Sequence, residues 1–184
     1  MKSKAGNYEV VVGRGAWRAF RSFPFGDYSS IFVLTEKKIW KRWQRTFLAE
    51  TRLKRQQTLF VAPGERSKEL PVLARLASVL LHRGADRRSL LILLGGGVIG
   101  DLGGFLASVY MRGIDYVNCP TTLLSQVDSG IGGKTAVNLG NAKNLVGSFY
   151  PPRQVLADSQ VLTSLSPRDL RSGVYEVVKH AILH

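Results

Sequence analysis

Cysteine and long hydrophobic runs are the features that this 184-residue sequence most clearly lacks. Cys119 is its single cysteine, which excludes an internal disulfide framework, and no cysteine–histidine spacing resembles a zinc finger. No run of about 18 apolar residues occurs, so the sequence predicts no membrane-spanning helix. The beginning of the chain has no apolar segment typical of a signal peptide. We therefore expect a cytoplasmic protein without a membrane partner.

Acidic residues are also scarce, because 13 Asp and Glu stand against 26 Lys and Arg and leave a net charge of +13. Such an excess suits anionic partners, including nucleic acid. The densest cationic block consists of Lys37, Lys38, Lys41, Arg42, Arg45, Arg52, Lys54 and Arg55. Trp40, Trp43 and Phe47 recur within it at near-helical spacing, so the cations should form the wet face of an amphipathic helix. We do not expect a nucleic-acid partner, and a basic nucleic-acid binder stays the last alternative.

Short apolar runs alternate with helical patterns, which is typical of a mostly parallel sheet with helices on its faces. The run Leu90–Leu94 has no polar alternation, so it should be a central strand buried on both sides. The expected strands are Tyr8–Val12, Ile31–Leu34, Thr58–Val61, Leu90–Leu94, Tyr116–Cys119 and Val155–Ala157. The expected helices are Lys37–Thr51, Ser67–His82, Val98–Tyr110 and Pro167–His184.

The last of these helices has a clear start signal and no stop signal. Ser166 is a typical N-cap, and Pro167 suits the first helical position. Beyond Gly173 the pattern continues to His184 without glycine, proline or a capping residue. We expect a domain of residues 1–165, followed in residues 166–184 by the first helix of a truncated second domain.

One glycine-rich motif, at residues 94–101, has the sequence L-G-G-G-V-I-G-D. Its glycines satisfy the G-x-G-x-x-G spacing between a buried strand and a helix. This context suits a pyrophosphate, because glycine permits close approach to the N–H groups at the positive helix end. The motif follows the fourth expected strand instead of the first, so a tight turn without a ligand remains equally open.

A second polar segment, at residues 120–135, has the sequence P-T-T-L-L-S-Q-V-D-S-G-I-G-G-K-T. It is not a P-loop, because G-x-x-x-x-G-K-T would need glycine where Asp128 stands. Its hydroxyl and N–H groups suit a ribose phosphate, and Lys134 suits a phosphate. A simple loop of turn-forming residues would not explain Asp128 and Lys134 among so many small residues.

Two weaker motifs follow towards the end of the chain. Asn138–Gly147 is a polar, hairpin-like stretch in which Lys143 and Asn144 are adjacent. Glu176, Lys179 and His180 lie at i, i+3 and i+4 and so share one helix face. Taken alone, this trio is best explained as a surface salt-bridge group that contributes little to stability.

Together, in this order and at these spacings, the motifs closely resemble those of the 3-dehydroquinate synthase family. The resemblance covers essentially the whole chain and is strongest from Gly95 to Lys179. It implies a Rossmann-like, doubly wound α/β domain that holds NAD, whereas the family's C-terminal helical domain is absent from this chain. It also implies a lyase that uses NAD and a divalent metal, zinc or cobalt, and is a homodimer at full length. The reaction cyclises 3-deoxy-D-arabino-heptulosonate 7-phosphate to 3-dehydroquinate and releases phosphate, in the shikimate pathway towards chorismate and the aromatic amino acids.

The resemblance assigns roles to the residues at matching positions. It implies that NAD is contacted by Glu36, Glu65, Lys68, Gly96, Gly97, Val98, Gly100, Asp101, Thr121, Thr122, Asp128, Lys134, Lys143, Val161, Leu162, Thr163 and Ser164. It implies that substrate binding and catalysis involve Arg112, Asp128, Lys134, Asn144 and Lys179. Glu36 and Pro63 stand where the family usually has Asp.

Glu176 is the one metal ligand that the resemblance implies, because the family's two histidine ligands belong to the missing second half. His180 could join Glu176 from the next helical turn, but a catalytic zinc site normally has three protein ligands. We therefore expect this chain alone to be inactive. Two alternatives stay open: a related sugar-phosphate cyclase that makes a cyclitol, and an NAD-binding fragment without activity.

Overall fold

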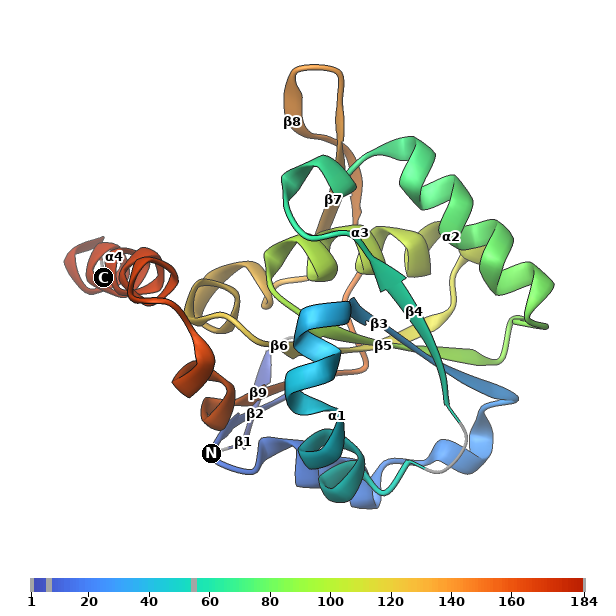
Figure 1. Cartoon of the computed structure of the whole chain (residues 1–184), viewed down its shortest axis with the longest axis horizontal. Coiled ribbons are helices and arrows are strands. Elements are labelled where there is room, and N and C mark those ends of the chain that lie inside the picture. The colour runs from blue at the N-terminus through green and yellow to red at the C-terminus, as the bar shows by residue number, and fades with distance from the viewer. Residues whose placement is uncertain (1, 6–7, 54–55, 184) are drawn as a thin grey trace.

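A seven-stranded sheet forms the centre of the structure, a computed structural model that describes residues 2–5, 8–53 and 56–183. Its strands are β1 (Lys2–Ala5), β2 (Tyr8–Gly13), β3 (Ser30–Glu36), β4 (Gln57–Val61), β5 (Ser89–Gly95), β6 (Asp115–Pro120) and β9 (Gln154–Asp158). In space their order is β1-β2-β9-β6-β5-β3-β4 (Figure 1). Within the described chain, β1 pairs antiparallel with β2, and the other six strands run parallel. The expected mostly parallel sheet is confirmed.

The middle of the sheet follows from the apolar runs of the sequence. Every residue of β5 is buried, as predicted for a central strand covered on both faces. The sequence did not predict β1, because Lys2–Ala5 has neither apolar alternation nor β-branched residues. The backbone of this segment joins the sheet by pairing with β2 at the sheet edge.

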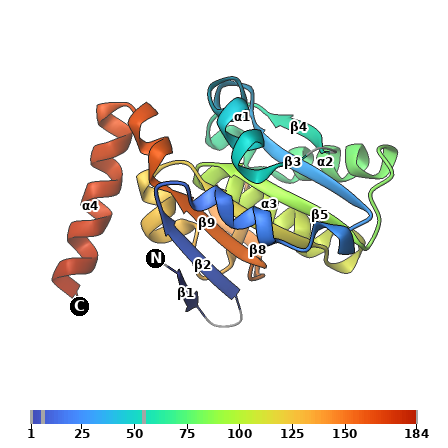
Figure 2. The ribbon, with the colours of Figure 1, turned by 90° about the horizontal axis from the view of Figure 1, so that it is seen from below.

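Helices cover both faces of the sheet, which confirms the predicted doubly wound α/β fold (Figure 2). The helices are α1 (Lys37–Thr51), α2 (Leu70–His82), α3 (Gly97–Val109) and α4 (Pro167–Leu183). On one face, α1 and the 3₁₀ segment Ala16–Ser22 bury Phe47, Trp17 and Phe20 against the sheet. On the other face, α2 and α3 pack on the sheet and contribute buried leucines such as Leu80 and Leu106.

Two helix predictions can be compared with the structure at their first residues. The amphipathic α1 is confirmed, with exposed lysines around the buried Phe47, while Lys54 and Arg55 lie outside the described residues. The predicted start of α2 at Ser67 is wrong, because the helix begins at Leu70 after a separate 3₁₀ turn, Glu65–Ser67. Glu69 is extended, and the proline at position 71 suits only the first turn of a helix.

Two elements extend from the layered core. The hairpin of β7 (Lys134–Leu139) and β8 (Ala142–Phe149) packs against α3 through β7 and projects outward in Figure 1. The helix α4 stands beside the sheet in both views. The N-cap predicted at Ser166 is confirmed, because its hydroxyl accepts from the backbone N–H of Asp169 at 3.1 Å. None of the helices in the described residues is long and apolar enough to cross a membrane.

Candidate functional site

The glycine motif lies where the strand order of the sheet reverses. The chain continues from β3 to β4 on one side and then returns to β5 on the other side of β3. Open α/β sheets bind ligands in the crevice outside the carboxyl ends of such strands. Gly96 follows the end of β5 in an extended conformation, and Gly97 begins α3. The N–H groups of Gly97 and Val98 in the first turn therefore face this crevice, whereas the N–H of Gly100 already donates to the carbonyl oxygen of Gly96 at 3.1 Å.

The glycine turn and the Pro120–Thr122 segment touch one another. The backbone N–H of Thr121 donates to the carbonyl oxygen of Gly95 at 2.8 Å. A Cβ on Gly96 would lie 3.1 Å from the methyl carbon of Thr122, a contact tight enough that Thr122 would have to shift slightly. Thr122 in turn exchanges hydrogen bonds with Ser125, which fixes the beginning of the next helical turn. The two segments therefore lie side by side at the carboxyl ends of β5 and β6.

A cavity of about 950 Å³ opens beside this turn. Its volume is at the upper end of the range for small-molecule pockets, roughly 300–1,000 Å³. Its lining residues are Glu36, Lys38, Ile39, Lys41, Arg42, Trp43, Gly96, Thr121, Thr122, Thr163, Ser164, Leu165 and Asp169. The structure thus brings six of the residues that the resemblance assigns to NAD around one cavity, from four separate segments of the chain.

Glu36 ends β3 on the wall of this cavity, next to the start of α1. Burial raises the pKa of its carboxyl, and the charge of Lys38 opposes that rise. A carboxylate at this place can accept hydrogen bonds from a ribose diol, which is the role of the acidic residue in dinucleotide folds. Lys38, Lys41 and Arg42 add positive charge along the same wall.

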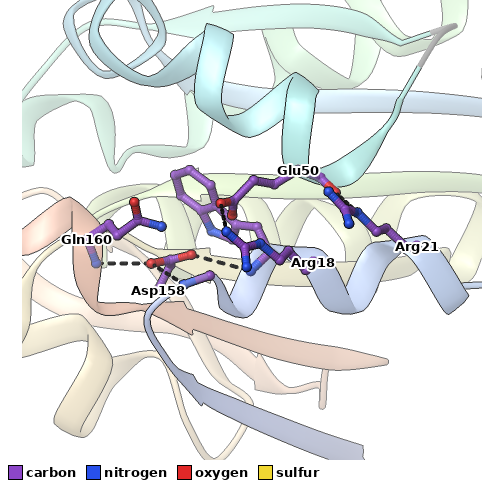
Figure 3. A network of polar contacts seen from close by, with 7 residues as sticks. Arg18, Arg21, Glu50, Asp158 and Gln160 are labelled. Carbon is purple, nitrogen blue, oxygen red and sulfur yellow. Dashed lines mark hydrogen bonds and ion pairs between the residues drawn. The ribbon is translucent and has the colours of Figure 1, made fainter.

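A buried carboxylate that the sequence did not single out positions the tract Val161–Ser164. Asp158, at the end of β9, is fully buried and accepts from the backbone N–H groups of Gly15, Trp17 and Gln160 (Figure 3). It thereby caps the 3₁₀ segment Ser159–Ser164. Asp directly after a strand and before Ser-Gln is a recognisable N-cap signal.

Only part of the Val161–Ser164 tract faces the cavity. Val161 is fully buried, and Leu162 packs against the core on the α1 face of the sheet. Thr163 and Ser164 are exposed and line the cavity. The indole N–H of Trp43 donates to the hydroxyl of Ser164 at 3.2 Å, which ties the tract to α1.

A second cavity, of about 510 Å³, lies between α3 and the β7–β8 hairpin. Its lining includes Asp101, Asp128, Lys134 and Asn144, so three of the predicted catalytic residues meet there. Lys68 is almost fully buried behind them, and its ammonium group bonds the side chains of both Asp101 and Asn144. Burial raises the pKa of the Asp101 carboxyl, and the hydrogen bond and charge of Lys68 oppose that rise.

Three predicted residues do not line this cavity. Lys143 is exposed on the hairpin, and Glu65 is exposed where the amide of Asn138 donates to it at 2.9 Å. Arg112 follows the opposite end of α3, a helix of 13 residues and therefore about 20 Å in length. The described residues that line the two larger cavities do not include these three.

A cluster of charged side chains forms where α4 meets the π-helical turn Ser125–Ser129. The expected common face of Glu176, Lys179 and His180 is confirmed, because the Lys179 ammonium and the His180 ring both contact the Glu176 carboxylate, the ring at 3.3 Å. The hydrogen bond to Glu176 raises the pKa of Lys179. Asp128 reaches the same place from the π-helical turn, and this approach was not predicted.

The donor set of this cluster fits a divalent metal. One carboxylate oxygen each from Asp128 and Glu176 and a ring nitrogen of His180 all lie within 4.8 Å of one another. Carboxylate oxygen and imidazole nitrogen are both common ligands of zinc, and imidazole suits related transition metals. The resemblance implied only Glu176. The i, i+4 spacing pointed to His180, whereas only the folded chain reveals Asp128.

Comparison with known proteins identifies the family of this chain. The family model for the N-terminal part of 3-dehydroquinate synthase matches residues 46–172. The 3-dehydroquinate synthase of Dictyoglomus thermophilum is 40% identical over 176 residues, which are 96% of this chain and 48% of that protein. The corresponding protein of Alkaliphilus metalliredigens is 42% identical over 180 residues, or 97% of this chain and 50% of that protein. The chain thus spans about half the length of these curated relatives.

Solved structures of sugar-phosphate cyclases have the same fold. A 2-deoxy-scyllo-inosose synthase in complex with carbaglucose-6-phosphate, NAD⁺ and Co²⁺ matches with a TM-score of 0.90 at 29% identity. The match covers 97% of this chain and 51% of that one. The 2-epi-5-epi-valiolone synthase of Streptomyces hygroscopicus, with NAD⁺ and Zn²⁺ bound, matches with a TM-score of 0.82 at 28% identity. That match covers 96% of this chain and 50% of the other.

Proposed function

This chain belongs to the 3-dehydroquinate synthase family, and we propose on this basis that it is the NAD-binding half of such an enzyme. The complete protein cyclises 3-deoxy-D-arabino-heptulosonate 7-phosphate to 3-dehydroquinate, releases phosphate and depends on NAD and a divalent metal. We place it in the cytoplasm as a homodimer without nucleic-acid or membrane partners, as the sequence analysis predicts. About 40% identity to 3-dehydroquinate synthases over nearly the whole chain supports this proposal.

The larger cavity carries the proposal at the level of the site. NAD binds there with its pyrophosphate at the N-terminus of α3, where glycines expose N–H groups and the helix dipole favours negative charge. Glu36 accepts from the ribose on the adenosine side, and Thr121 and Thr122 contact the nicotinamide side. The position of these residues around one crevice at the switch point supports the assignment.

The smaller cavity is the part of the substrate site that this chain supplies. Lys134 and Asn144 bind the phosphate and hydroxyl groups of the sugar phosphate, and Lys68 holds Asn144 in place from behind. Asp128 lies at the wall of this cavity and also reaches the cluster on α4, so it can contact both substrate and cofactor. The metal, when bound, polarises the reacting hydroxyl as a Lewis acid, and Glu176 is a ligand.

A cyclase that makes a cyclitol is the second candidate, because the matching structures include two such enzymes. Identity separates the two hypotheses: the chain is 40% identical to a 3-dehydroquinate synthase and 29% identical to the 2-deoxy-scyllo-inosose synthase. The first function is therefore the one that we propose.

A fusion protein tests this proposal directly. Residues 1–184 are joined to the C-terminal half of the Dictyoglomus thermophilum synthase, and phosphate release is measured with NAD and zinc or cobalt. We expect turnover of the heptulosonate 7-phosphate and none of glucose 6-phosphate. Turnover of glucose 6-phosphate alone would favour the cyclitol-forming alternative. A folded fusion that binds NAD but turns over neither substrate would contradict both.

A further inference from the structure

A third cavity, of about 270 Å³, lies at the edge of the sheet opposite to the glycine turn. Because β3, β5, β6 and β9 run parallel, their first residues meet at this edge, where Ser30 pairs with Ser89. The seven residues of β5 separate it from the glycine turn by about 20 Å, at about 3.3 Å per residue. The residues that line the cavity begin these strands or precede them: Asp27, Tyr28, Arg87, Arg88, Gly113, Ile114, Asp115 and Arg153.

We propose that this cavity binds a small phosphate dianion, either inorganic phosphate or the phosphate group of a small ester, through Arg87, Arg88 and Arg153. The proposed function uses none of these residues, and the proposal does not depend on that function. The volume of the cavity is below the roughly 300–1,000 Å³ of typical small-molecule pockets. It therefore suits a small anion better than a nucleotide.

Positive charge exceeds negative charge in the lining of this cavity. Three guanidinium groups stand against the carboxylates of Asp27 and Asp115. Arg87 is exposed, and its guanidinium group makes no hydrogen bond or ion pair with the residues that the structure describes. A guanidinium group presents its N–H groups as a planar fork that matches pairs of phosphate oxygens. The cavity thus offers an anion at least one cation that no carboxylate neutralises.

Hydrogen bonds hold Arg88 at the mouth of the cavity. Its guanidinium group donates to the carbonyl oxygen of Asp27 at 2.9 Å, and its own carbonyl oxygen accepts from the backbone N–H of Ser29 at 3.0 Å. The backbone N–H of Arg88 donates to the carboxylate of Asp86 at 2.8 Å. These bonds engage only one of the five N–H donors that a guanidinium group carries. Arg88 can therefore bind an anion without leaving its place.

The pair of Arg153 and Asp115 is weak enough to be exchanged. Nε of Arg153 lies 3.6 Å from Oδ2 of Asp115, beyond the roughly 2.7–3.2 Å of an N–H···O hydrogen bond. The two side chains are 62% and 40% exposed, and ion pairs as exposed as this one contribute little. The same Oδ2 accepts from the hydroxyl of Tyr28 at 2.8 Å. Burial and this hydrogen bond raise the pKa of Tyr28 to about 12, so the hydroxyl keeps its proton and continues to hold Asp115 when Arg153 turns to a phosphate oxygen.

Titration of the ¹⁵N-labelled 184-residue chain, followed by NMR at constant ionic strength, tests the site. The probes are inorganic phosphate and glycerol 3-phosphate, and the one with the higher affinity identifies the source of the phosphate group. We expect saturable shifts at the backbone amides of Arg88 and Asp115. A phosphate group in the proposed NAD site would instead shift the amide of Gly97, so the two sites are read separately. Shifts at Gly97 alone, or no shifts with either probe, would overturn the proposal.

Three variants, each shown to be folded by its NMR spectrum, define the outcome. Arg87→Gln should weaken phosphate binding by about tenfold, the effect of one hydrogen bond between charged groups. Asp115→Asn should strengthen it by about twofold to fivefold, because the amide still accepts from Tyr28 but no longer competes for Arg153. Arg45→Gln is the control with the same change of charge, since Arg45 is exposed on α1 outside the lining. A loss in Arg45→Gln equal to that in Arg87→Gln would assign the binding to the net charge of the chain and overturn the site, and so would weaker binding in Asp115→Asn.

Discussion

The ammonium group of Lys68, in a side chain that is only 4% exposed, pairs with the carboxylate of Asp101, the fifth residue of α3. The pair links the loop before α2 to the helix that begins at the glycine turn. Because the same ammonium also bonds Asn144 of the hairpin, Lys68 joins both sides of the smaller cavity. The group of Lys68, Asp101 and Asn144 should therefore affect the stability of the fold as well as ligand binding in the smaller cavity. Its effect on stability should depend on pH.

Lys68→Met should destabilise the fold by about 3 kcal/mol at pH 7, the low end for a broken buried pair, because the Asp101 side chain keeps 18% exposure. Loss of the ammonium raises the pKa of Asp101 further above its unfolded value. A raised carboxyl pKa contributes stability that is present below the unfolded pKa and is lost as pH rises through the folded pKa. The loss of unfolding free energy caused by Lys68→Met should therefore shrink as pH falls towards about 4.

Urea unfolding of the native chain and of Lys68→Met at several pH values measures this loss. The exposed Lys38→Met is the control. A loss that does not depend on pH would contradict the ion-pair account.

Gly97→Val should weaken NAD binding severely while the chain still folds. Even a Cβ at this position would lie 3.2 Å from the hydroxyl of Ser129, and valine would place a further methyl group where the pyrophosphate must approach the helix end. Fluorescence titration with NADH measures the effect. Gly26→Val is the matched control, because a Cβ there meets open space. Unchanged affinity in a folded Gly97→Val variant would mean that this glycine serves only the turn.

Two glycines of α3 should respond in opposite ways to alanine. At Gly103 a Cβ would overlap with the side chain of Leu93, which is fully buried, so Gly103→Ala should cost about 1–3 kcal/mol through overpacking. At Gly100 a Cβ would lie 3.7 Å from the amide nitrogen of Asn118, an ordinary contact. Gly100→Ala should therefore stabilise the fold by about 0.5–1 kcal/mol through backbone entropy. Denaturant unfolding of both variants distinguishes the two effects, and equal stabilities would contradict the packing of α3 on β5.

Glu36→Ala should shift the cofactor preference from NAD towards NADP. In the proposed NAD site the Glu36 carboxylate would accept from the ribose 2′-hydroxyl and repel a 2′-phosphate, whereas Lys38, Lys41 and Arg42 line the same wall and would attract one. We expect the ratio of the affinities for NADH and NADPH to change by about tenfold, because one hydrogen bond to a charged group contributes about 1.5 kcal/mol. Burial raises the pKa of Glu36. As the pH falls, the carboxylate should therefore become protonated, and the preference of the native chain for NAD over NADP should weaken, at a higher pH than for an ordinary glutamate. Parallel NADH and NADPH titrations measure this, with the exposed Asp27→Ala as control; an unaltered ratio would remove Glu36 from the ribose site.

The sequence predicted what depends on local pattern. Leu90–Leu94 could only be a buried strand, and the glycines after it could only be a tight turn at its end, because both follow from residues adjacent in the chain. Lys2–Ala5 could not be predicted, since its strand exists through pairing with β2 and not through its own propensity.

The approach of Asp128 to α4 depends in the same way on tertiary packing, at Gly173, between residues that are far apart in the sequence. Asp158 is an intermediate case. Its capping pattern is local, but its bonds to Gly15 and Trp17 cross more than 140 positions. Sequence reasoning therefore located the segments of the site better than the contacts between them.

The chain alone should release no phosphate from the heptulosonate 7-phosphate, even with NAD and a saturating divalent metal. In the proposed site, Lys134 and Asn144 line the smaller cavity, and they supply only one wall of the pocket that the reaction requires. Positioning contributes up to about 7–11 kcal/mol of the barrier reduction in enzymes, so a substrate held on one side loses most of the acceleration. A metal held by Glu176 would not restore it, because a Lewis acid accelerates the reaction only when the reacting hydroxyl is held against it. A phosphate-release assay on the isolated chain, with the active fusion protein as the positive control, measures this. Turnover close to that of the fusion would show that the second half is dispensable, and the division of the substrate site between two halves would have to be abandoned.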